Sequence, residues 1–568
     1  MRNITRLAIL LPAVILSTSV LSSAQNNSTL RKKPMIENET EQDPYLPNAF
    51  HNQRTSPPYK FSGKGITKQK QQTLSGSSIT TTQVNVDANG QNILGDAANE
   101  PNITVNPLNA NDISIGWRQF DNVASNFRQA GWGYTSNGGT TWTFPGVIDP
   151  GVFRSDPVLD FDASGNFYYN SLTSTFSCRV YKSTNGGATW DLGIYAGGGD
   201  KQWMTIDRTT GVGAGNIYSS WSLFATYCQS GNFTRLQNVN AAFDSCTNVT
   251  DAPFWMNMAV GNNGELYIAG ADTVNSEMEV VVSPDAKNNS TVTWNTPVPV
   301  FMDGAMGGWN NVNPQGLLGM CNVDVDRSGG PGNGNVYVLA STQRYSNGDP
   351  GDVMFSRSID GGLTWSSPMQ INDDNSTFNT QWLAVMSVAP NGRIDVAWLD
   401  TRDSPGYDSS ALYYSYSLDQ GNTWSPNEKM SASFDPHVGY PNQSKMGDYF
   451  DMISDNTGAH LAWANTLNGE EDVYYSYIVP PVNAGVQELD ASGLFTLYPN
   501  PGNGHFMLTG KNIPRSVELY NVMGEKIMTF LPCASKSEFD ISSFASGVYF
   551  VKITSDDGKV GVKKLVKE

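Results

Sequence analysis

The sequence predicts an all-β protein, and three observations lead to that class. Glycine is abundant at 55 of 568 residues, aromatic residues reach 11% and charged residues only 15%. This mixture favours short strands joined by tight turns over helices. An eight-residue turn motif returns several times, and longer units that contain it repeat between about residues 79 and 480. Repetition at this scale is typical of proteins built from many small antiparallel sheets.

The chain opens with a pattern typical of a secretory signal. Arg2 and Arg6 supply positive charge, residues 7–20 are apolar, and Ser22-Ser23-Ala24 offers a cleavage site of small residues. No other stretch approaches the ~18 apolar residues needed to cross a bilayer. We therefore expect residues 1–24 to be a signal peptide and the mature chain to have no transmembrane segment. Residues 25–75 are rich in polar residues and Pro, and we expect a disordered leader there.

The turn motif follows the template Ser/Thr-x-Asp/Asn-x-Gly-x-Thr-Trp. Asp or Asn tolerates left-handed backbone and bonds its own turn, Gly supplies positive φ, and Ser or Thr oxygens satisfy nearby amides. The Trp is expected to fold back as an apolar plug against the sheet. Its copies lie at 135–142, 183–190, 358–365 and 417–424, and a longer, distorted copy at 283–294.

The longer unit consists of an apolar strand, a Gly/Asn/Asp turn, a second strand and a Tyr-rich third strand. Seven units of roughly 45 to 65 residues, each with three or four antiparallel strands, predict a seven-bladed β-propeller over residues 76–480. A six-bladed ring stays open as the alternative, if the third or fourth unit is an elaborated loop. The units open at 100–105, 155–162, 200–207, 255–260, 319–326, 381–385 and 447–452.

The seventh unit reaches its Tyr-rich strand at 473–477 but has no outer strand of its own. Residues 79–86 are the simplest source of that strand. Their pairing would close the ring and remove an exposed sheet edge.

The composition changes after Pro480-Pro481, and residues 481–493 are expected to be a linker. Residues 494–568 predict a separate small β-sandwich, since alternating strands at 494–501, 516–521 and 547–553 are separated by turn residues.

Cysteine and histidine usage predicts one disulfide and no metal site. Cys228 and Cys246 flank one local excursion and are the expected pair in an oxidising compartment, whereas Cys533 is expected to be unpaired. With four His and no Cys-x-x-Cys motif, a zinc site is not expected. Two Asp-rich turns, at 160–166 and 324–329, offer oxygens for Ca²⁺, but neither completes an EF-hand loop and ordinary hairpin turns explain them better. No cofactor is therefore expected.

The net charge of −18 and the pI near 4.6 exclude nucleic acid and anionic membranes as natural partners. We expect a monomer.

The inner strands of a propeller line its channel, so their first polar residues converge on one face. Here these residues are Glu100, Asp156, Asp200, Lys201, Asn257, Asn322, Gln381, Asp448 and Tyr449. Nearby in sequence lie Arg118, Arg154, Arg344 and Arg402, and Trp203, Trp255 and Trp382 offer flat surfaces for a sugar. The alternative is that Asp and Asn at strand starts cap turns and line a water-filled channel.

The tail closely resembles the C-terminal sorting domain of the type IX secretion system. The resemblance rests on Tyr498-Pro499-Asn500-Pro501, on 519–524, on Gly547-Val548-Tyr549 and on the Lys-rich final strand. It implies that residues 494–568 interact with that secretion machinery. It also implies export across the outer membrane, often followed by removal of the domain and attachment to the cell surface.

The repeats resemble the Asp boxes of the sialidase superfamily, which lie on the outer rim and also occur in proteins without sialidase activity. A sialidase needs three Arg to grip the substrate carboxylate, an Asp acid/base, and a Tyr nucleophile assisted by Glu. The family's Arg-Ile-Pro segment has only a poor counterpart at Arg154. The resemblance makes Tyr449 the candidate nucleophile with Glu100 as its base and Asp156 as a third catalytic residue; the candidate ligand-binding residues are Arg118, Arg154, Arg344, Arg402, Asp200, Trp203, Trp382 and Asp448.

The sequence thus predicts a secreted or surface-attached, sialidase-like propeller that acts on or binds a glycan or surface polysaccharide, with exo-α-sialidase or another glycoside hydrolase activity as one option. The alternative is a non-catalytic surface propeller that binds protein or polysaccharide. Whether the protein is an enzyme stays open at this point.

Overall fold

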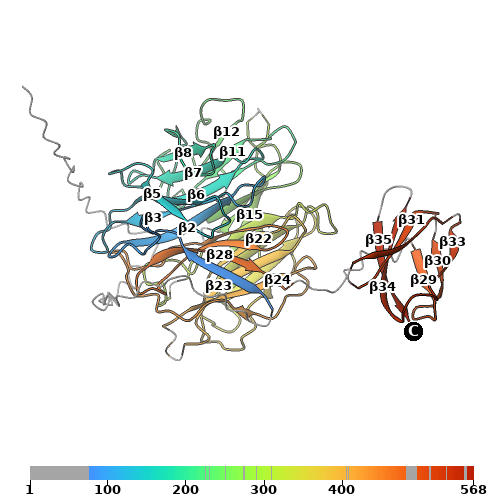
Figure 1. Cartoon of the computed structure of the whole chain (residues 1–568). Helices are drawn as coiled ribbons and strands as arrows, with labels where there is room; N and C mark the ends of the chain where they lie inside the picture. The colour runs from blue at the N-terminus through green and yellow to red at the C-terminus, as the bar shows by residue number, and fades with distance from the viewer. Residues whose placement is uncertain are drawn as a thin grey trace, which may run out of the picture. The chain divides into compact units, whose positions relative to one another are not determined.

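The computed structural model describes residues 76–481 and 495–568, apart from 224, 229–230, 250, 252, 273–275, 289–290, 309, 405, 407, 511–512, 523, 533 and 556–559. The predicted signal peptide, the leader, Cys533 and nearly all of the predicted linker lie outside these residues. The chain divides into two compact units, Met1–Pro480 and Pro481–Glu568 (Figure 1). Every regular element in the described residues is a β-strand. None of them belongs to a helix long and apolar enough to span a membrane.

The first unit contains seven small antiparallel sheets, numbered here in chain order. Sheet 1 holds β2 (Ala97–Val105), β3 (Ile113–Phe120), β4 (Gln129–Thr135) and β5 (Thr143–Val147). Sheet 2 holds β6 (Ser155–Phe161), β7 (Phe167–Leu172), β8 (Cys178–Ser183) and β9 (Ile194–Tyr195). Sheet 3 holds β10 (Trp203–Ile206), β11 (Ile217–Ser220) and β12 (Phe233–Leu236). Sheet 4 holds β13 (Phe254–Val260), β14 (Leu266–Ala271), β15 (Met278–Ser283) and β16 (Val298–Val300).

The remaining sheets follow the same pattern. Sheet 5 holds β17 (Gly304–Ala305), β18 (Asn322–Val325), β19 (Val336–Arg344), β20 (Asp352–Ser358) and β21 (Met369–Gln370). Sheet 6 holds β22 (Gln381–Val388), β23 (Ile394–Asp400), β24 (Ala411–Ser417) and β25 (Glu428–Lys429). Sheet 7 holds β26 (Asp451–Ser454), β27 (Ala459–Asn465), β28 (Asp472–Val479) and, from the other end of the unit, β1 (Ser78–Gln83).

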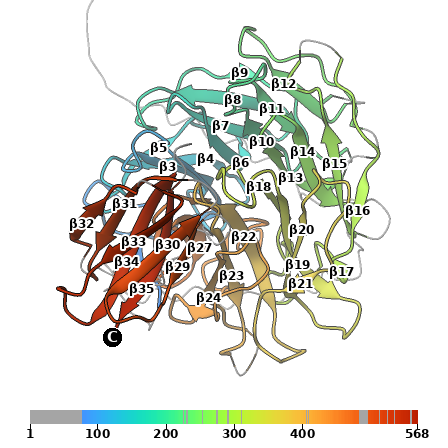
Figure 2. The ribbon, with the colours of Figure 1, turned by 90° about the vertical axis from the view of Figure 1, so that its right-hand side faces the viewer.

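One strand of each sheet packs beside the corresponding strands of the neighbouring sheets. From β2 this order runs through β6, β10, β13, β18, β22 and β26, and β26 packs against β2 again. Figure 2 shows the sheets following one another around a common centre. We call these strands the inner strands, since they lie nearest that centre.

A left-handed residue lies near the start of each inner strand, inside β2, β6, β13 and β22 and a few residues before β10, β18 and β26. These residues are Glu100, Asp156, Lys201, Trp255, Gly319, Leu383 and Gly447. In β2, β6, β13 and β22 the register shifts at this point, as at a β-bulge. Non-glycine residues held in this conformation cost free energy and often occur at functional sites. Glu100, Asp156 and Lys201, which the sequence predicted to face the channel, are three of them.

The motif hairpins share one hydrogen-bond pattern. In the copy at 417–424, Ser417 Oγ accepts the Gly421 N–H at 2.9 Å and donates to Asp419 Oδ1 at 2.9 Å. Asp419 in turn accepts the Thr423 N–H at 2.9 Å and the Thr423 hydroxyl at 2.7 Å. The copies at 135–142, 183–190 and 358–365 repeat the turn contacts. The distorted copy at 283–294 keeps the bonds of Asp285 to Ser283 and Thr293.

These hairpins also pack on the preceding sheet. Trp142 of sheet 1 meets Tyr475 of β28 at a ring distance of 5.4 Å, and Trp424 of sheet 6 meets Phe355 of β20 at 5.1 Å. In these two copies the Trp therefore contacts the preceding sheet, whereas Trp190 meets Tyr169 of its own sheet at 5.6 Å.

The predicted pairing with the Tyr-rich strand of the last sheet is confirmed for residues 79–83. β1 pairs antiparallel with β28, Thr81 and Ser476 share a hydroxyl hydrogen bond of 2.8 Å, and Ile79 is buried in the core of sheets 6 and 7. The third strand of the last sheet is thus covered by residues from the start of the unit.

The second unit contains two sheets around one core. One holds β29 (Phe495–Tyr498), β30 (His505–Gly510) and β33 (Lys536–Asp540); the other holds β32 (Lys526–Phe530), β31 (Pro514–Tyr520), β34 (Gly547–Ser555) and β35 (Val560–Lys567). Phe506 and Leu508 of the first sheet and Val517 and Val551 of the second belong to the same apolar cluster. Alternating buried and exposed residues along β33 give the sandwich its inner and outer faces.

Candidate functional site

Seven charged residues at the inner strands form one connected ion cluster, which we call the central cluster. Its members are Glu100, Arg118, Asp156, Asp200, Lys201, Lys445 and Asp448. Lys445 Nζ lies 3.0 Å from Glu100 Oε1 and 2.5 Å from Asp448 Oδ2. Arg118 Nε lies 3.3 Å from Glu100 Oε2. The cluster therefore joins β2 and β3 of sheet 1 to the segment that precedes β26.

Lys201 extends the central cluster to sheets 2 and 3. Its Nζ lies 3.2 Å from Asp448, 3.4 Å from Asp200 and 3.7 Å from Asp156, and its side chain is 11% exposed. Burial alone would lower the pKa of Lys201, but these carboxylates raise it well above its ordinary value. The ammonium group therefore stays charged.

The pKa values of the carboxylates in the central cluster are shifted in different directions. Burial raises the pKa of Glu100 despite Arg118 and Lys445. The pKa of Asp448 is lowered, because Lys445 and Lys201 outweigh its burial. Lys201 likewise lowers the pKa of Asp156 against the effect of burial. With four acidic and three basic members, the charges nearly cancel within the cluster.

Arg118 is engaged on several sides. It is 0% exposed, and besides the Glu100 contact it donates to Asn99 Oδ1 at 2.8 Å and to Gln443 Oε1 at 2.9 Å. A planar guanidinium that grips a substrate carboxylate must present two N–H groups to it. Here the protein takes up those of Nε and Nη1.

Tyr449, the candidate nucleophile, lies beside the central cluster and is buried. Its hydroxyl donates to the carbonyl of Pro157 at 2.8 Å, and its ring meets Trp203 edge-on at 5.4 Å. Burial, followed by the charges of Glu100 and Asp156, raises its pKa well above the ordinary value. The structure thus brings the three predicted catalytic residues together, but it holds the Tyr449 phenol protonated and hydrogen-bonded to backbone.

The four predicted arginines do not converge. Arg154 pairs with Asp149 at 3.0 Å beside sheet 2, and Arg344 pairs with Asp303 and Asp352 in sheet 5, both at 2.6 Å. Arg402 contacts Asp373 at 2.6 Å and Asp400 at 2.8 Å in sheet 6. Only Arg118 belongs to the central cluster.

The predicted tryptophan platforms face protein. Trp382 is fully buried and donates from Nε1 to Ser410 Oγ at 3.0 Å, while Trp203 packs on Tyr449. Trp255 is buried against Phe254, at a ring distance of 4.6 Å. A part for these residues, or for the arginines, in ligand binding stays a prediction.

Two other residues that the sequence predicted to line the channel make contacts within the protein. Asn322 of β18 donates to Ala384 O at 3.0 Å and accepts the Met386 N–H at 3.3 Å, so it joins sheet 5 to sheet 6. Gln381 donates to Asp400 Oδ1 at 3.2 Å within sheet 6. The side chains of these two residues are therefore engaged within the protein.

Sequence reasoning missed Lys445 and Gln443. Both lie in the loop before β26, outside any strand pattern, and only the spacing of three residues between Lys445 and Asp448 signalled a contact. Loop residues of this kind are placed by tertiary structure and not by local periodicity.

A second set of carboxylates, Asp160, Asp324 and Asp451, lies further along the inner strands. Asp160 accepts the Ile206 N–H at 2.8 Å and Asp324 that of Val388 at 2.9 Å, so each joins adjacent sheets. Burial raises the pKa of Asp451 to about 7. No group of three or more acidic, His or Cys side chains among the described residues is arranged to hold a metal ion.

The two turns considered for Ca²⁺ use their carboxylates within the turn. Asp162 accepts the Ser164 and Asn166 amides at 2.9 and 3.0 Å, and Asp326 accepts the Ser328 amide at 2.8 Å. Ca²⁺ binding at either turn stays untested.

Comparison with solved structures finds matches at low identity. A protein of unknown function from Dyadobacter fermentans is 13% identical, with 72% of this chain and 100% of that chain covered and a TM-score of 0.42. Hydrazine synthase from Kuenenia stuttgartiensis is 11% identical over 66% of this chain and 94% of that one, with a TM-score of 0.40. A mutant of AofleA from Arthrobotrys oligospora is 10% identical over 63% and 90%, with a TM-score of 0.35. These values are too low for any function to be carried over.

No curated protein matches the chain. Residues 496–568 match the family model of the secretion system C-terminal sorting domain, which covers nearly the whole small sandwich. The protein is therefore exported through type IX secretion, to the cell surface or into the medium.

Proposed function

We propose that this protein is an exported β-propeller that binds glycans at the cell surface without cleaving them. In this proposal the seven sheets of residues 76–480 are the seven blades and the motif hairpins are Asp boxes. Residues 494–568 direct export and are removed afterwards, and the mature protein acts as a monomer without a cofactor.

The observation that carries the proposal is the compensation of charge in the central cluster. Lys201 and Lys445 lie between carboxylates, and Arg118 donates to Glu100, Asn99 and Gln443. Removing one member of such a buried set leaves an uncompensated charge, which costs several kcal/mol. A group that must stay paired for stability is poorly suited to grip an acidic substrate, so the central cluster serves best as a structural hub.

The ligand class is supported by the resemblance of the hairpins to Asp boxes and by export to the cell surface. A central cluster whose charges are paired with one another favours a neutral sugar over sialic acid. Sialic acid needs cations that are free to bind its carboxylate.

The second candidate is an exo-α-sialidase, favoured by the grouping of Tyr449 with Glu100 and Asp156. It requires the Tyr449 hydroxyl to leave Pro157 and reach a substrate. The two candidates differ in turnover and can be separated by one set of measurements.

The test uses the purified mature chain on a panel of fluorogenic glycosides that includes sialosides, and on a glycan array. We expect no turnover and specific binding to neutral glycans. Release of sialic acid that Tyr449→Phe abolishes would establish the sialidase instead. No turnover of any glycoside together with no binding on the glycan array would overturn the glycan proposal and favour a protein partner.

A further inference from the structure

Within the described residues, sheet 3 has three strands and no outer fourth strand, and another segment covers its edge. Residues 244–249, here called the strap, run along β12 without forming a regular strand. Thr247 and Phe233 form an antiparallel bridge, and Asp244 N donates to Arg235 O at 2.8 Å. The strap therefore follows the position of a fourth strand but departs from it between these two contacts.

The predicted disulfide holds the strap in place and is confirmed. Cys246 of the strap is bonded to Cys228, which lies in the loop between β11 and β12. A second contact supports the same wall, because Thr234 Oγ1 donates to the carbonyl of Asp244 at 2.7 Å. The strap is thus fixed to sheet 3 by a covalent bond and by side-chain and main-chain hydrogen bonds.

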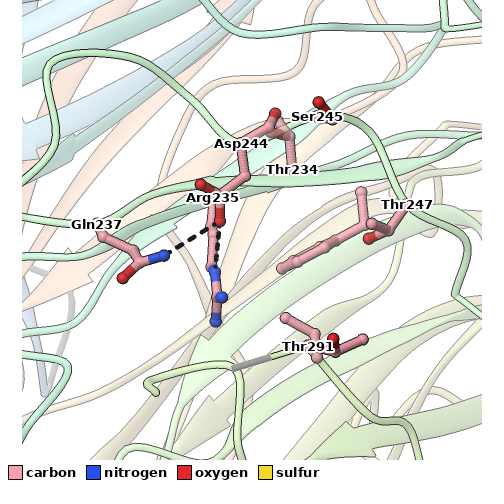
Figure 3. Close-up of a pocket in the computed structure, with 9 residues that line it drawn as sticks. Thr234, Arg235, Gln237, Asp244, Ser245, Thr247 and Thr291 are labelled. Atoms are coloured by element: carbon pink, nitrogen blue, oxygen red, sulfur yellow. Dashed lines mark hydrogen bonds and ion pairs between the residues drawn. The ribbon is translucent and has the colours of Figure 1, made fainter. Parts of the chain in front are cut away.

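A pocket of about 290 Å³ opens between β12, the strap and the hairpin segment of sheet 4. Figure 3 shows its polar wall, where Arg235 and Gln237 both direct nitrogen atoms toward Asp244. Its lining residues are Phe233, Thr234, Arg235, Gln237, Asp244, Ser245, Thr247, Thr291 and Val292. Phe233 and Val292 form the apolar part, and Phe233 is held edge-on by Trp294 at 5.0 Å.

The polar groups of the pocket are compensated in charge but keep capacity for hydrogen bonds. Arg235 Nε donates to Asp244 Oδ2 at 2.9 Å, and Gln237 Nε2 donates to the same oxygen at 3.2 Å. In the described part of the chain, Asp244 Oδ1 and the hydroxyls of Ser245, Thr247 and Thr291 have no hydrogen-bond partner. These groups offer one carboxylate acceptor and three hydroxyls to a ligand.

This combination selects a neutral, hydroxyl-rich ligand. Asp244 would repel a phosphate or carboxylate, and Arg235 would repel a cation. The pocket therefore disfavours charged ligands of either sign. Sugar hydroxyls can both donate to carboxylate oxygens and accept from hydroxyls and amides, while the ring C–H groups contact Val292. Ligand sites usually begin near ~300 Å³, so the pocket suits one sugar ring and not a longer chain.

We infer that this pocket binds a single neutral sugar residue of a glycan, with Asp244, Ser245 and Thr291 as its hydrogen-bond partners. The inference rests on the proposed glycan-binding function and gives that function a location on the rim of sheet 3, away from the central cluster. Among the sheets of the described residues, the disulfide-bonded strap is found at sheet 3 alone.

Titration calorimetry of the purified mature chain tests this inference. The probes are cellotetraose, mannotetraose and xylotetraose, with sialyllactose as the acidic comparison. Thr291→Ala, Ser245→Ala and Asp244→Asn should each weaken binding of the preferred neutral probe about five- to tenfold, the effect of one lost hydrogen bond.

Two matched variants serve as controls. Asp403→Asn changes an ion-paired Asp with 37% exposure, close to the 35% of Asp244, on sheet 6. Thr210→Ala removes an exposed hydroxyl outside the pocket, as Thr291→Ala does within it. Both should bind the probe as the unaltered chain does, and all variants should show the same thermal unfolding.

The outcomes separate the two proposals. Weaker binding in the pocket variants alone, with hydrogen-exchange protection of residues 233–247 by the probe, supports the pocket. Unchanged binding in all three pocket variants overturns the pocket and leaves glycan binding standing. Tighter binding of sialyllactose overturns the neutral class. Failure of every probe to bind the unaltered chain, together with silence on the glycan array, overturns the proposed function itself.

Discussion

Lys201 shows how one side chain can control the stability of the whole centre. Its left-handed backbone directs the ammonium group between Asp156, Asp200 and Asp448, which come from three different parts of the chain. Without that charge the three carboxylates would repel one another in a buried site. The lysine therefore acts as the counter-ion of the central cluster.

Lys201→Met should lower the free energy of unfolding by roughly 3–5 kcal/mol at pH 7, because it leaves buried carboxylates uncompensated. Urea denaturation checks this. The control is Lys182→Met, since Lys182 is 38% exposed and lies 3.9 Å from Asp162; it should cost about 1 kcal/mol or less. Equal losses in the two variants would show that the central cluster contributes no more than a surface pair.

The buried carboxyl of Asp96 makes the free energy of unfolding depend on pH, and its raised pKa fixes the direction. Burial raises its pKa to about 6, so the folded protein binds the Asp96 proton more tightly than the unfolded chain does. The resulting stabilisation is complete below pH ~4 and is lost as the pH rises through 6.

Asp96→Asn imitates the protonated acid and should flatten the decline in unfolding free energy between pH 4 and 7. Denaturation at pH 4.5, 6 and 7.5 measures the slope, with Asp149→Asn, at a carboxyl that is 41% exposed, as the control. A slope unchanged by Asp96→Asn would mean that other carboxyls set the pH dependence.

At the scale of elements, the structure of the motif hairpins explains why one position of the eight-residue motif holds glycine and its neighbour accepts another residue. In the four regular copies the fifth position is Gly, while the fourth holds Gln420 at φ 65 in the last of them. A Cβ on Gly139, at the fifth position, would lie 2.1 Å from the ring of Tyr475, whereas one on Gly138 would meet only Asn111 Oδ1 at 3.2 Å. Glycine is thus required at the fifth position for two reasons. The neighbouring sheet leaves no room for a Cβ, and the backbone there has a positive φ.

Gly138→Ala should cost about 1–2 kcal/mol for left-handed backbone alone. Gly139→Ala should cost roughly 2–5 kcal/mol, because the clash with Tyr475 adds to the same strain. Thermal and chemical denaturation of the two single variants provides the comparison. Equal costs would show that the hairpin does not depend on its contact with sheet 7.

The sequence predicted the hairpins because turn chemistry is local, and it predicted the distant pairing because the last unit has no outer strand of its own. Turn chemistry at 417–424 and strand pairing by residues 79–83 follow from composition, pattern and the missing partner of β28. The arrangement of Arg154, Arg344 and Arg402 did not follow, since each is fixed by carboxylates on other segments. No sequence pattern predicted the pocket at Arg235, because the irregular strap forms one of its walls.

At the scale of the whole molecule, the two units divide two tasks. The small sandwich carries the match to the sorting domain, and the seven sheets carry the candidate sites. Export and ligand binding should therefore be separable by truncation.

Deletion of residues 494–568 should retain the protein inside the cell envelope, with at least a tenfold loss from the surface and the medium. Cell fractionation and immunoblotting in a host with type IX secretion measure the distribution. Tyr449→Phe, which leaves the sorting domain intact, is the control and should be exported normally. Normal export of the truncated chain would contradict the assignment of the signal to these residues.

The pairing of β1 with β28 has a consequence for folding kinetics. Thr81 and Ser476 are 395 residues apart, whereas most strand pairs within a sheet join residues that are close in sequence. Local pairs form early, and a contact of such high sequence separation forms late because a long loop must close first. Folding should therefore end in one slow step that depends on the last strand of the first unit. Until residue 479 is available, β1 has no partner and the chain remains an open row of sheets.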